Sequence, residues 1–583
     1  MSTRLSAADH VVIVGYFVLL AGVGLYFWRR MRRVSDLFTA GNAIPWWLAG
    51  VSFYLTAFSA FTFVAYSEMA YRYGLVAVTL TWSSAAAMLT GTILLAGKWR
   101  RARIISPVEF LEARYSPQIR QALAWAGLPL KIIDDGLKIY ATGIFVSVGL
   151  GYDLKTSVVA SGAVMALYTF MGGLWAVVIT DYVQFVILTL GVAVLFPLVF
   201  AHIGFEGFFQ HSPAGFFHPV QAPFSWLYVV AFYLLVQLSY NGNWAFAQKF
   251  YSVPDERAAR KAGLLATALK LVGPPLFILP AMAARQLMPE LMQPPNSPQY
   301  AYAALSLRFL PAGLMGLMVA AMFSATMSTL SADYNVMASV ITEDIYRRLF
   351  DRNASQRRLV IVGRLATLLV AATTVGIAII LVGTATRGLF EMMVTLFSLF
   401  VAPMLIPMLA GLLSRRVTWR GATAGIVCGF VTGFGLYLYR VLVLADRPGI
   451  DPAWVRYDFE AISILANVGV TTAAMAVTTM LERITPEERQ RTADFFTVLQ
   501  TPVTAPAADA EGAFSPFRVI GWVTGAVAVL LISAGVPQSS GLARVVDLSV
   551  GGALLTIAFG FYTLNRRLVN ARAAAASAKE AGR

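Results

Sequence analysis

The sequence is poor in the residues that most catalytic and metal centres use. It contains one cysteine, Cys428, and four histidines among 583 residues. One cysteine cannot form a disulfide framework or a cysteine metal cluster, and no two histidines are spaced as H-x-x-x-H. We also find no Walker phosphate loop and no G-x-G-x-x-G dinucleotide turn. These absences argue against cofactor chemistry and, with no nucleophile, base and acid set in the sequence, against an enzyme.

Charge is scarce as well. Only 13% of the residues are charged, whereas about 25% is usual for a soluble domain. Hydrophobic residues make up 58% and the mean hydropathy is +0.68. Apolar runs of about 18–25 residues recur from end to end, and each can span a hydrocarbon core of about 30 Å. Strands of a membrane barrel would alternate polar and apolar residues. The sequence therefore predicts an all-α polytopic membrane protein.

The excess of positive charge follows the expected spans. The net charge is +15, which could indicate a nucleic-acid partner, but the basic clusters each lie just outside an apolar run. This is the positive-inside pattern, so we expect a lipid bilayer and no nucleic acid as partner. The loop 202–224 contains no Lys or Arg and is expected outside. The basic clusters are RRMRR (29–33), KWRRAR (98–103), RRLFDRNASQRR (347–358), SRRVTWR (414–420) and NRRLVNAR (565–572).

Apolar runs and charges together predict about fifteen spans, with the N-terminus outside and the C-terminus inside. Residues 10–28 are expected to be a membrane helix and not a cleaved signal, because the basic cluster follows the apolar run. The polar stretch 485–515 is rich in Pro and Ala and predicts a cytoplasmic linker. The helices are expected near 10–28, 47–70, 75–97, 120–149, 154–172, 177–201, 225–248, 262–286, 307–340, 358–384, 388–413, 421–441, 459–481, 517–535 and 545–565.

Six polar residues follow one another within residues 326–335, inside an expected span. Ala325, Ser328 and Thr329 are spaced i, i+3 and i+4, so they share one helix face. A carbonyl and two hydroxyls there form half of an oxygen cage, which suits a monovalent cation better than Ca²⁺ or Mg²⁺. Alternatively, the hydroxyls bond back to carbonyls of their own helix.

Three other spans carry polar residues with two interpretations each. Residues 56–62 predict either close packing of small residues or a helix broken at mid-membrane that binds a cation. Asp181 lies near the start of its span and is either a surface acid or a functional one. The segment KIIDDGLKIY (131–140) predicts i,i+4 ion pairs of Lys131 with Asp135 and of Asp134 with Lys138, or an acid that faces a central cavity.

Five stretches in this order resemble the sodium:solute symporter family, which includes sodium–glucose, sodium–proline, sodium–iodide and sodium–sialic acid carriers. The similarity runs from about residue 8 to 440. The stretches are SFYLTAFSAFTFVA (52–65), GGLWAVVITDYVQ (172–184), QKFYSVPDERAARKAG (248–263), FSATMSTLSADYNVMASVITEDIY (323–346) and RRVTWRGATAGIVCGF (415–430).

The resemblance implies the leucine-transporter-type fold, in which two inverted five-helix repeats follow one extra helix. It also implies sodium-coupled symport of a small polar organic solute by alternating access, in the plasma membrane. The corresponding division of the chain is 1–46 (extra helix and basic loop), 47–201 (first repeat), 225–413 (second repeat), 414–481 (additional helices), 482–516 (linker) and 517–583 (C-terminal helices and basic tail).

The same resemblance implies where the coupling ion binds. In this family a sodium ion lies between the broken first repeat helix and the eighth core helix. By position, its ligands here are the carbonyls of Leu55, Phe58 and Ala325 and the hydroxyls of Ser328 and Thr329. These residues agree with the oxygen face described above.

A second cation site involves Asp181, Ser331 and Asp333. Asp181 matches an acid that some members use near a more cytoplasmic sodium site, and Ser331 fits that site too. Ala332 stands where those members carry a hydroxyl, and Asp333 is placed to compensate or to bind a proton. A proton-coupled carrier that uses Asp181 or Asp333 is therefore the alternative to sodium coupling.

The solute cavity differs from that of sugar carriers, which carry Gln and Glu where this chain has Thr62 and Thr81. They also carry Asn where this chain has Asp134 and Tyr240. The resemblance therefore leaves the solute open among sugars, amino acids, carboxylates and nucleoside-like compounds. The candidate cavity residues are Thr62, Thr81, Asp134, Tyr240, Asn241 and Asn243.

Overall fold

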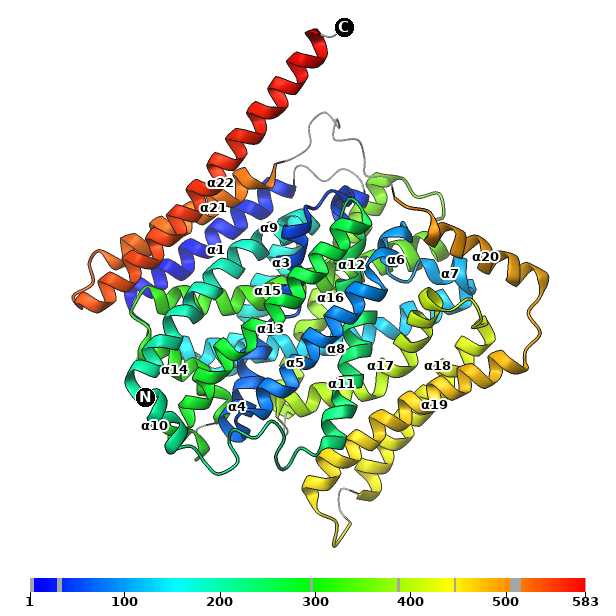
Figure 1. Cartoon of the computed structure of the whole chain (residues 1–583), viewed down its shortest axis with the longest axis horizontal. Helices are drawn as coiled ribbons and strands as arrows, with labels where there is room; N and C mark the ends of the chain where they lie inside the picture. Colours follow the sequence, from blue (N-terminus) through cyan, green and yellow to red (C-terminus); the bar gives the residue numbers. More distant parts are fainter. Residues whose placement is uncertain are drawn as a thin grey trace.

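The computed structural model describes residues 5–28, 34–293, 297–384, 388–444, 447–503 and 515–581, and no β-strand occurs in these ranges. Figure 1 shows α1, α21 and α22 side by side at one edge of the molecule, and α18 and α19 paired at the opposite edge. The basic cluster at 29–33 and residues 504–514 of the expected linker lie outside the described residues.

The helices of the first half follow the expected apolar runs. Their bounds are α1 Ala7–Trp28, α2 Val34–Phe38, α3 Trp46–Thr56, α4 Ser67–Tyr73, α5 Val76–Leu94, α6 Ala96–Arg101, α7 Phe110–Arg114, α8 Pro117–Leu150, α9 Leu154–Ile203, α10 Phe205–Gln210, α11 Trp226–Gly242, α12 Trp244–Tyr251 and α13 Glu256–Leu287.

The second half continues in the same way, and a π-helical segment at Val340–Phe350 extends α15. The bounds are α14 Ala301–Phe309, α15 Leu314–Ser339, α16 Gln356–Thr384, α17 Leu389–Leu413, α18 Trp419–Tyr439, α19 Phe459–Leu481, α20 Pro486–Gln500, α21 Pro516–Gly535 and α22 Gly541–Ala581.

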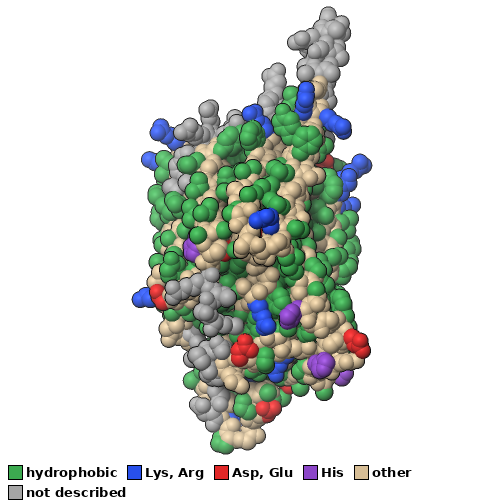
Figure 2. Space-filling model, turned by 90° about the vertical axis from the view of Figure 1, so that its left-hand side faces the viewer, with side chains coloured by type: hydrophobic (Ala, Val, Ile, Leu, Met, Phe, Trp, Pro, Cys, Tyr) green, Lys and Arg blue, Asp and Glu red, His purple; other side chains and the backbone are tan. Residues whose placement is uncertain are grey.

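Eleven helical segments within the described ranges are long and apolar enough to cross a membrane, whereas we expected about fifteen spans. The difference arises where an expected span is divided into shorter helices, is joined to the next span, as in α9, or carries several charges, as α8 does with two lysines and two aspartates. The outer helices expose large apolar side chains, such as Val11, Leu369 and Val431. In Figure 2 hydrophobic side chains cover most of the middle of one face, and charged ones gather toward its two ends.

Helix α15 forms the centre of the molecule, because every residue from Leu314 to Ser339 is buried. It packs against α1, α3, α8, α9 and α16. The polar residues predicted to carry function are therefore enclosed by protein on all sides, where an unpartnered polar group is costly.

The two helices expected at 154–172 and 177–201 form one hydrogen-bonded helix, α9. The hydroxyl of Tyr168 nevertheless lies 2.5 Å from that of Thr180. Residues twelve apart in a straight helix are separated by about 18 Å along the axis, which is beyond the reach of two side chains. Helix α9 therefore bends sharply between these residues, and its two halves run in different directions.

The span expected at 225–248 is broken, which the sequence analysis did not predict. Helix α11 ends at Gly242, and α12 begins at Trp244. The side-chain carbonyl of Asn243 accepts hydrogen bonds from the amides of Ala245 and Phe246 at 2.9 and 3.4 Å. This is an N-cap, and it starts a new helix in the middle of the apolar run.

The stretch 485–515, which we expected to be a cytoplasmic linker, contains a helix that was not predicted, because residues 486–500 form α20. Phe495, Phe496 and Leu499 of α20 are buried, and the helix packs on α6 and α7. Arg491 also donates to the carbonyl of Tyr115 at 2.5 Å. Helix α20 is thus attached to the loop that joins α5 to α8.

Candidate functional site

Four of the five residues of the expected sodium site meet where α3 ends beside α15. The hydroxyl oxygen of Thr329 lies 3.4 Å from the carbonyl oxygen of Leu55, 3.2 Å from that of Phe58 and 3.2 Å from that of Ala325. The hydroxyl of Ser328 is buried and has no hydrogen-bond partner among the described residues. The fold therefore brings together one hydroxyl, that of Thr329, and three carbonyls, those of Leu55, Phe58 and Ala325.

The carbonyl of Phe58 is available because the helix is broken there. Helix α3 ends at Thr56, and a π-helical turn restarts at Thr62. In a continuous helix the amide of Thr62 would bond to the carbonyl of Phe58. It bonds instead to the carbonyl of Ser59 at 2.8 Å. The break predicted within residues 56–62 therefore exists, and it frees an oxygen that faces α15.

This group of oxygens contains more acceptors than donors. A hydroxyl carries one proton, so Thr329 can donate to only one of the three carbonyls around it. The bond from Thr329 back to Ala325 is the one that the back-bonding alternative predicts, but it leaves the carbonyls of Leu55 and Phe58 at the same hydroxyl. A surplus of neutral oxygens is the ligand set that a monovalent cation requires.

Asp181 is fully buried, so the interpretation of this residue as a surface acid is wrong. One of its carboxylate oxygens accepts a hydrogen bond from the hydroxyl of Ser52 in α3. The other oxygen has no hydrogen-bond partner among the described residues. The acid thus lies inside the bundle, on the side of α9 that contacts the broken helix.

The three residues of the expected second cation site have different partners. The hydroxyl of Ser331 lies 2.9 Å from that of Thr169 in α9. Asp333, two residues later and thus on another face of α15, binds lysines of α8. The structure therefore does not place Asp181, Ser331 and Asp333 around one point.

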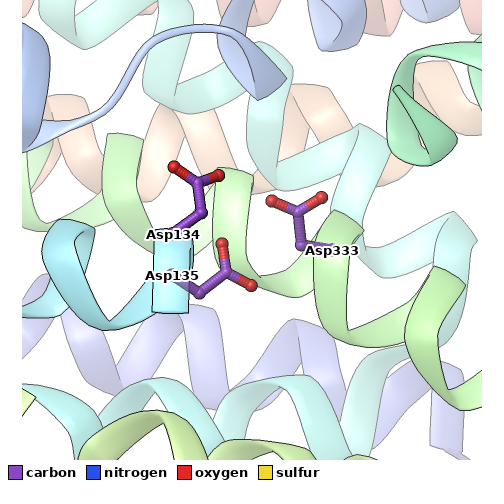
Figure 3. A group of neighbouring side chains, drawn as sticks. All are labelled: Asp134, Asp135 and Asp333. Atoms are coloured by element: carbon purple, nitrogen blue, oxygen red, sulfur yellow. The ribbon is translucent and has the colours of Figure 1, made fainter. Parts of the chain in front are cut away.

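Five charged side chains of α8 and α15 form a buried cluster, and Figure 3 shows its three aspartates. The predicted pair of Asp134 with Lys138 is confirmed at 2.8 Å. The predicted pair of Lys131 with Asp135 is wrong, because Lys131 binds Asp333 at 2.5 Å. Asp135 and Asp333 instead share Lys138, at 2.7 and 2.9 Å. The partner of Lys131 is thus Asp333 of α15 and not Asp135, its neighbour on α8.

A cavity of about 110 Å³ adjoins the oxygen cage, since Thr329 lines it. Asp134, Lys138 and Asp333 form part of its wall. Asn241 does not reach it, because its amide donates to the carbonyls of Ala87 and Gln237. Five of the six candidate solute residues do line it, namely Thr62, Thr81, Asp134, Tyr240 and Asn243.

Lys270 of α13 is among the cavity residues that the sequence analysis missed. Its ammonium donates to the carbonyl of Ala57 in the break between α3 and α4, at 2.7 Å. It also lies over the rings of Tyr54 and Phe58, at 5.4 and 5.0 Å from their centroids. A signal was present, because an ionisable residue inside an apolar span marks a functional position by default.

The structure and the sequence are similar to those of known sodium-coupled transporters. The model of the sodium:solute symporter family matches residues 37–429. The sodium/glucose cotransporter 4 of Danio rerio is 29% identical over 441 residues, which are 69% of this chain and 67% of that protein. The sodium/glucose cotransporter of Vibrio parahaemolyticus is 28% identical over 400 residues, which are 62% of this chain and 73% of that protein.

A solved structure of a sodium-coupled sialic acid symporter, in a substrate-bound outward-open state, superimposes with a TM-score of 0.71. It is 22% identical, and the match covers 82% of this chain and 99% of that one. This likeness shows the leucine-transporter-type fold that the resemblance implied. The family match covers well over half of the chain, and it agrees with the broken helix and the central α15. The chain therefore belongs to the sodium:solute symporter family and is a multi-pass membrane transporter, not an enzyme.

Proposed function

We propose that this symporter drives the uptake of a small polar organic solute with a sodium ion held between α3 and α15. The ligands are the carbonyls of Leu55, Phe58 and Ala325 and the hydroxyls of Ser328 and Thr329. The position of one hydroxyl among three carbonyl oxygens supports this site most directly. The adjoining cavity, which shares Thr329 with the cage, is the place for the solute.

The shared wall gives a physical route for coupling. An ion in the cage ties the end of α3 to α15, and this fixes the cavity wall formed by residues 56–62. A solute that fits the fixed wall then binds more tightly, and by linkage it tightens sodium binding by the same factor. The repeats 47–201 and 225–413 then rock to open the inner side.

The orientation and the membrane follow from the same proposal. With the N-terminus outside and the C-terminus inside, in the plasma membrane, sodium enters down its gradient. A membrane potential of 100 mV adds about 2.3 kcal/mol for each sodium that crosses. The charge clusters outside the spans favour this orientation, because cytoplasmic loops carry the excess of Lys and Arg.

The cage can be tested before the solute is known, by measuring the melting temperature of purified protein. Sodium chloride is titrated against choline chloride at constant ionic strength, because a ligand that binds only the folded protein stabilises it. We expect sodium to raise the melting temperature. Ser328→Ala and Thr329→Ala each remove one ligand worth about 1–3 kcal/mol, so each should need roughly 5- to 150-fold more sodium for the same shift.

A matched control is Thr373→Ala, which removes a hydroxyl that bonds only within α16. It should keep the sodium requirement of the unchanged protein. An unaltered sodium response in well-folded Ser328→Ala and Thr329→Ala would exclude the cage.

Proton coupling through Asp181 or Asp333 is the second candidate. Asp181 favours this candidate, because it is fully buried and one of its carboxylate oxygens has no hydrogen-bond partner among the described residues. A proton-driven carrier would transport equally well when choline replaces sodium at fixed pH, and its transport would follow an imposed pH gradient. Asp181→Asn would then abolish the pH response and leave any sodium response intact.

A further inference from the structure

The wall of the cavity formed by α8 and α15 carries an excess of negative charge. The carboxylates of Asp134, Asp135 and Asp333 lie within 4.8 Å of one another, and they bind two ammonium groups, those of Lys131 and Lys138. Three negative charges against two positive ones leave one negative charge unbalanced. Figure 3 shows the three carboxylates converging between the two helices.

The unbalanced charge can reach the cavity through Asp134. Its ion pair with Lys138 uses Oδ2, and its side chain lines the cavity. Asp135 is fully buried and has one oxygen without a hydrogen-bond partner among the described residues, so it is not accessible to a solute. Asp134 is therefore the carboxylate that a positively charged group in the cavity would meet.

Another part of the cavity wall, formed by α13 and the broken helix, carries one unbalanced positive charge. Lys270 is only 2% exposed, and no carboxylate of the described residues lies within ion-pair distance of its ammonium. Its contacts are the carbonyl of Ala57 and two aromatic rings. A carbonyl and ring faces compensate a buried ammonium less well than a carboxylate does.

The remaining buried charges near the cage do not change this distribution. Lys249 of α12 is fully buried and interacts electrostatically with Asp181. One lysine and one aspartate balance each other, and neither of them lines the cavity. The cavity is thus formally neutral but polarised, with a carboxylate excess on one part of its wall and a lone ammonium on another.

We propose that the solute of this symporter is a zwitterion of the amino-acid class. Its ammonium group binds Asp134, and its carboxylate binds Lys270. Such a solute compensates both buried charges, whereas a neutral sugar compensates neither and a simple amine or carboxylate compensates one. This assignment rests on the proposed function, because it takes the cavity beside the sodium cage as the solute site.

The first test is the melting temperature of the purified protein in saturating sodium with each member of a fixed panel. The panel contains the twenty standard amino acids, D-glucose, myo-inositol and N-acetylneuraminic acid. We expect at least one amino acid to stabilise the protein more than any other compound. A sugar, inositol or sialic acid that stabilises it as much as the best amino acid overturns the proposal, and so does the absence of any response to the amino acids.

The second test compares ligand analogues that lack one charged group with protein variants that lack the charge expected to bind that group. For the best amino acid, the amine without its carboxylate and the acid without its amino group should each bind about tenfold or more weakly to the unchanged protein. Lys270→Gln should lose the preference for the amino acid over the amine and keep the preference over the acid. Asp134→Asn should lose the preference for the amino acid over the acid and keep the preference over the amine.

If both variants keep the preference for the amino acid over its two analogues, the proposal is overturned. As a control, Lys270→Arg keeps the positive charge and should keep both preferences. If a variant does not fold, the two analogues on the unchanged protein decide, since equal binding of all three compounds overturns the proposal. The outcomes also separate the two levels of inference. A sugar that stabilises the protein only in sodium contradicts the zwitterionic solute but agrees with sodium coupling. An amino acid that stabilises the protein equally in choline agrees with the zwitterionic solute but contradicts sodium coupling.

Discussion

Lys131 shows how far a local pattern determines a buried ion pair. Its spacing to Asp135 predicts a pair on one helix face, but in the folded protein Lys131 binds Asp333 of α15. The spacing describes only α8, whereas the choice of partner depends on which helix packs against it. The pair of Asp134 with Lys138 was predictable because both residues belong to α8. The pair of Lys131 with Asp333 could not be predicted from the sequence, because it depends on how α8 and α15 pack together.

Lys131→Gln should destabilise the protein strongly, because it leaves three buried carboxylates with one lysine. Breaking a buried pair by removing one partner costs about 3–5 kcal/mol. Lys131→Gln combined with Asp333→Asn should recover much of this loss, which thermal unfolding of the purified protein can measure. As a control, Arg358→Gln breaks an exposed pair with Asp351 and should change the stability little, because solvent screens exposed ion pairs. A double variant as unstable as the single one would contradict the pairing.

The helices themselves were largely predictable, because each expected apolar run contains helix. A break near residues 56–62 was one of two interpretations of that stretch, and the family resemblance identified it as the partner of the oxygen face of α15. The break at Asn243 was not predicted, since apolar content alone does not reveal where a span is divided. The bend of α9 falls where two separate spans were expected, but their joining into one helix was not predicted. Helix α20 was missed although Thr485 and Glu488 form a capping box, a recognised helix start.

Helix α20 should be held to the loop between α5 and α8 mainly by its buried aromatic residues. Phe496→Ala removes a side chain that is 6% exposed, and a buried Phe→Ala change costs about 3–5 kcal/mol. We expect faster hydrogen exchange over residues 486–500 and unchanged exchange over α15. Thr497→Ala, which removes a hydroxyl bonded only to its own helix, should leave exchange as it is. Equal protection in Phe496→Ala would show that α20 is held by other contacts.

The surface of the whole molecule supports one orientation in the membrane. At the end of the face in Figure 2 where the C-terminal helix projects, Lys and Arg are the main charged side chains, whereas the other end carries Asp, Glu and His together with some Lys and Arg. Excess Lys and Arg are typical of the cytoplasmic side. The two ends of the molecule therefore differ in the way that the sequence pattern predicts for an N-out and C-in protein.

This orientation predicts which introduced cysteines react with an impermeant thiol reagent in intact cells. The native Cys428 is first replaced by serine, which leaves no background thiol. His211→Cys lies in the loop after α10 and Asn353→Cys in the loop before α16, and both side chains are exposed. The first should react from outside, and the second only after the cells are opened. The reverse pattern would invert the assignment.

The pairing of α1 with α21 has a consequence for the making of the protein. The two helices are in close contact, since a Cβ at Gly15 would lie 2.9 Å from a methyl carbon of Leu530. A ribosome adds about 5–20 residues per second, so the partner of α1 emerges roughly 25–100 s after α1 itself. During that interval lipid must cover the face of α1 that later meets α21. The contacts of α1 with α9 and α15 can form earlier, so the contact with α21 completes this edge after the transport core has been made.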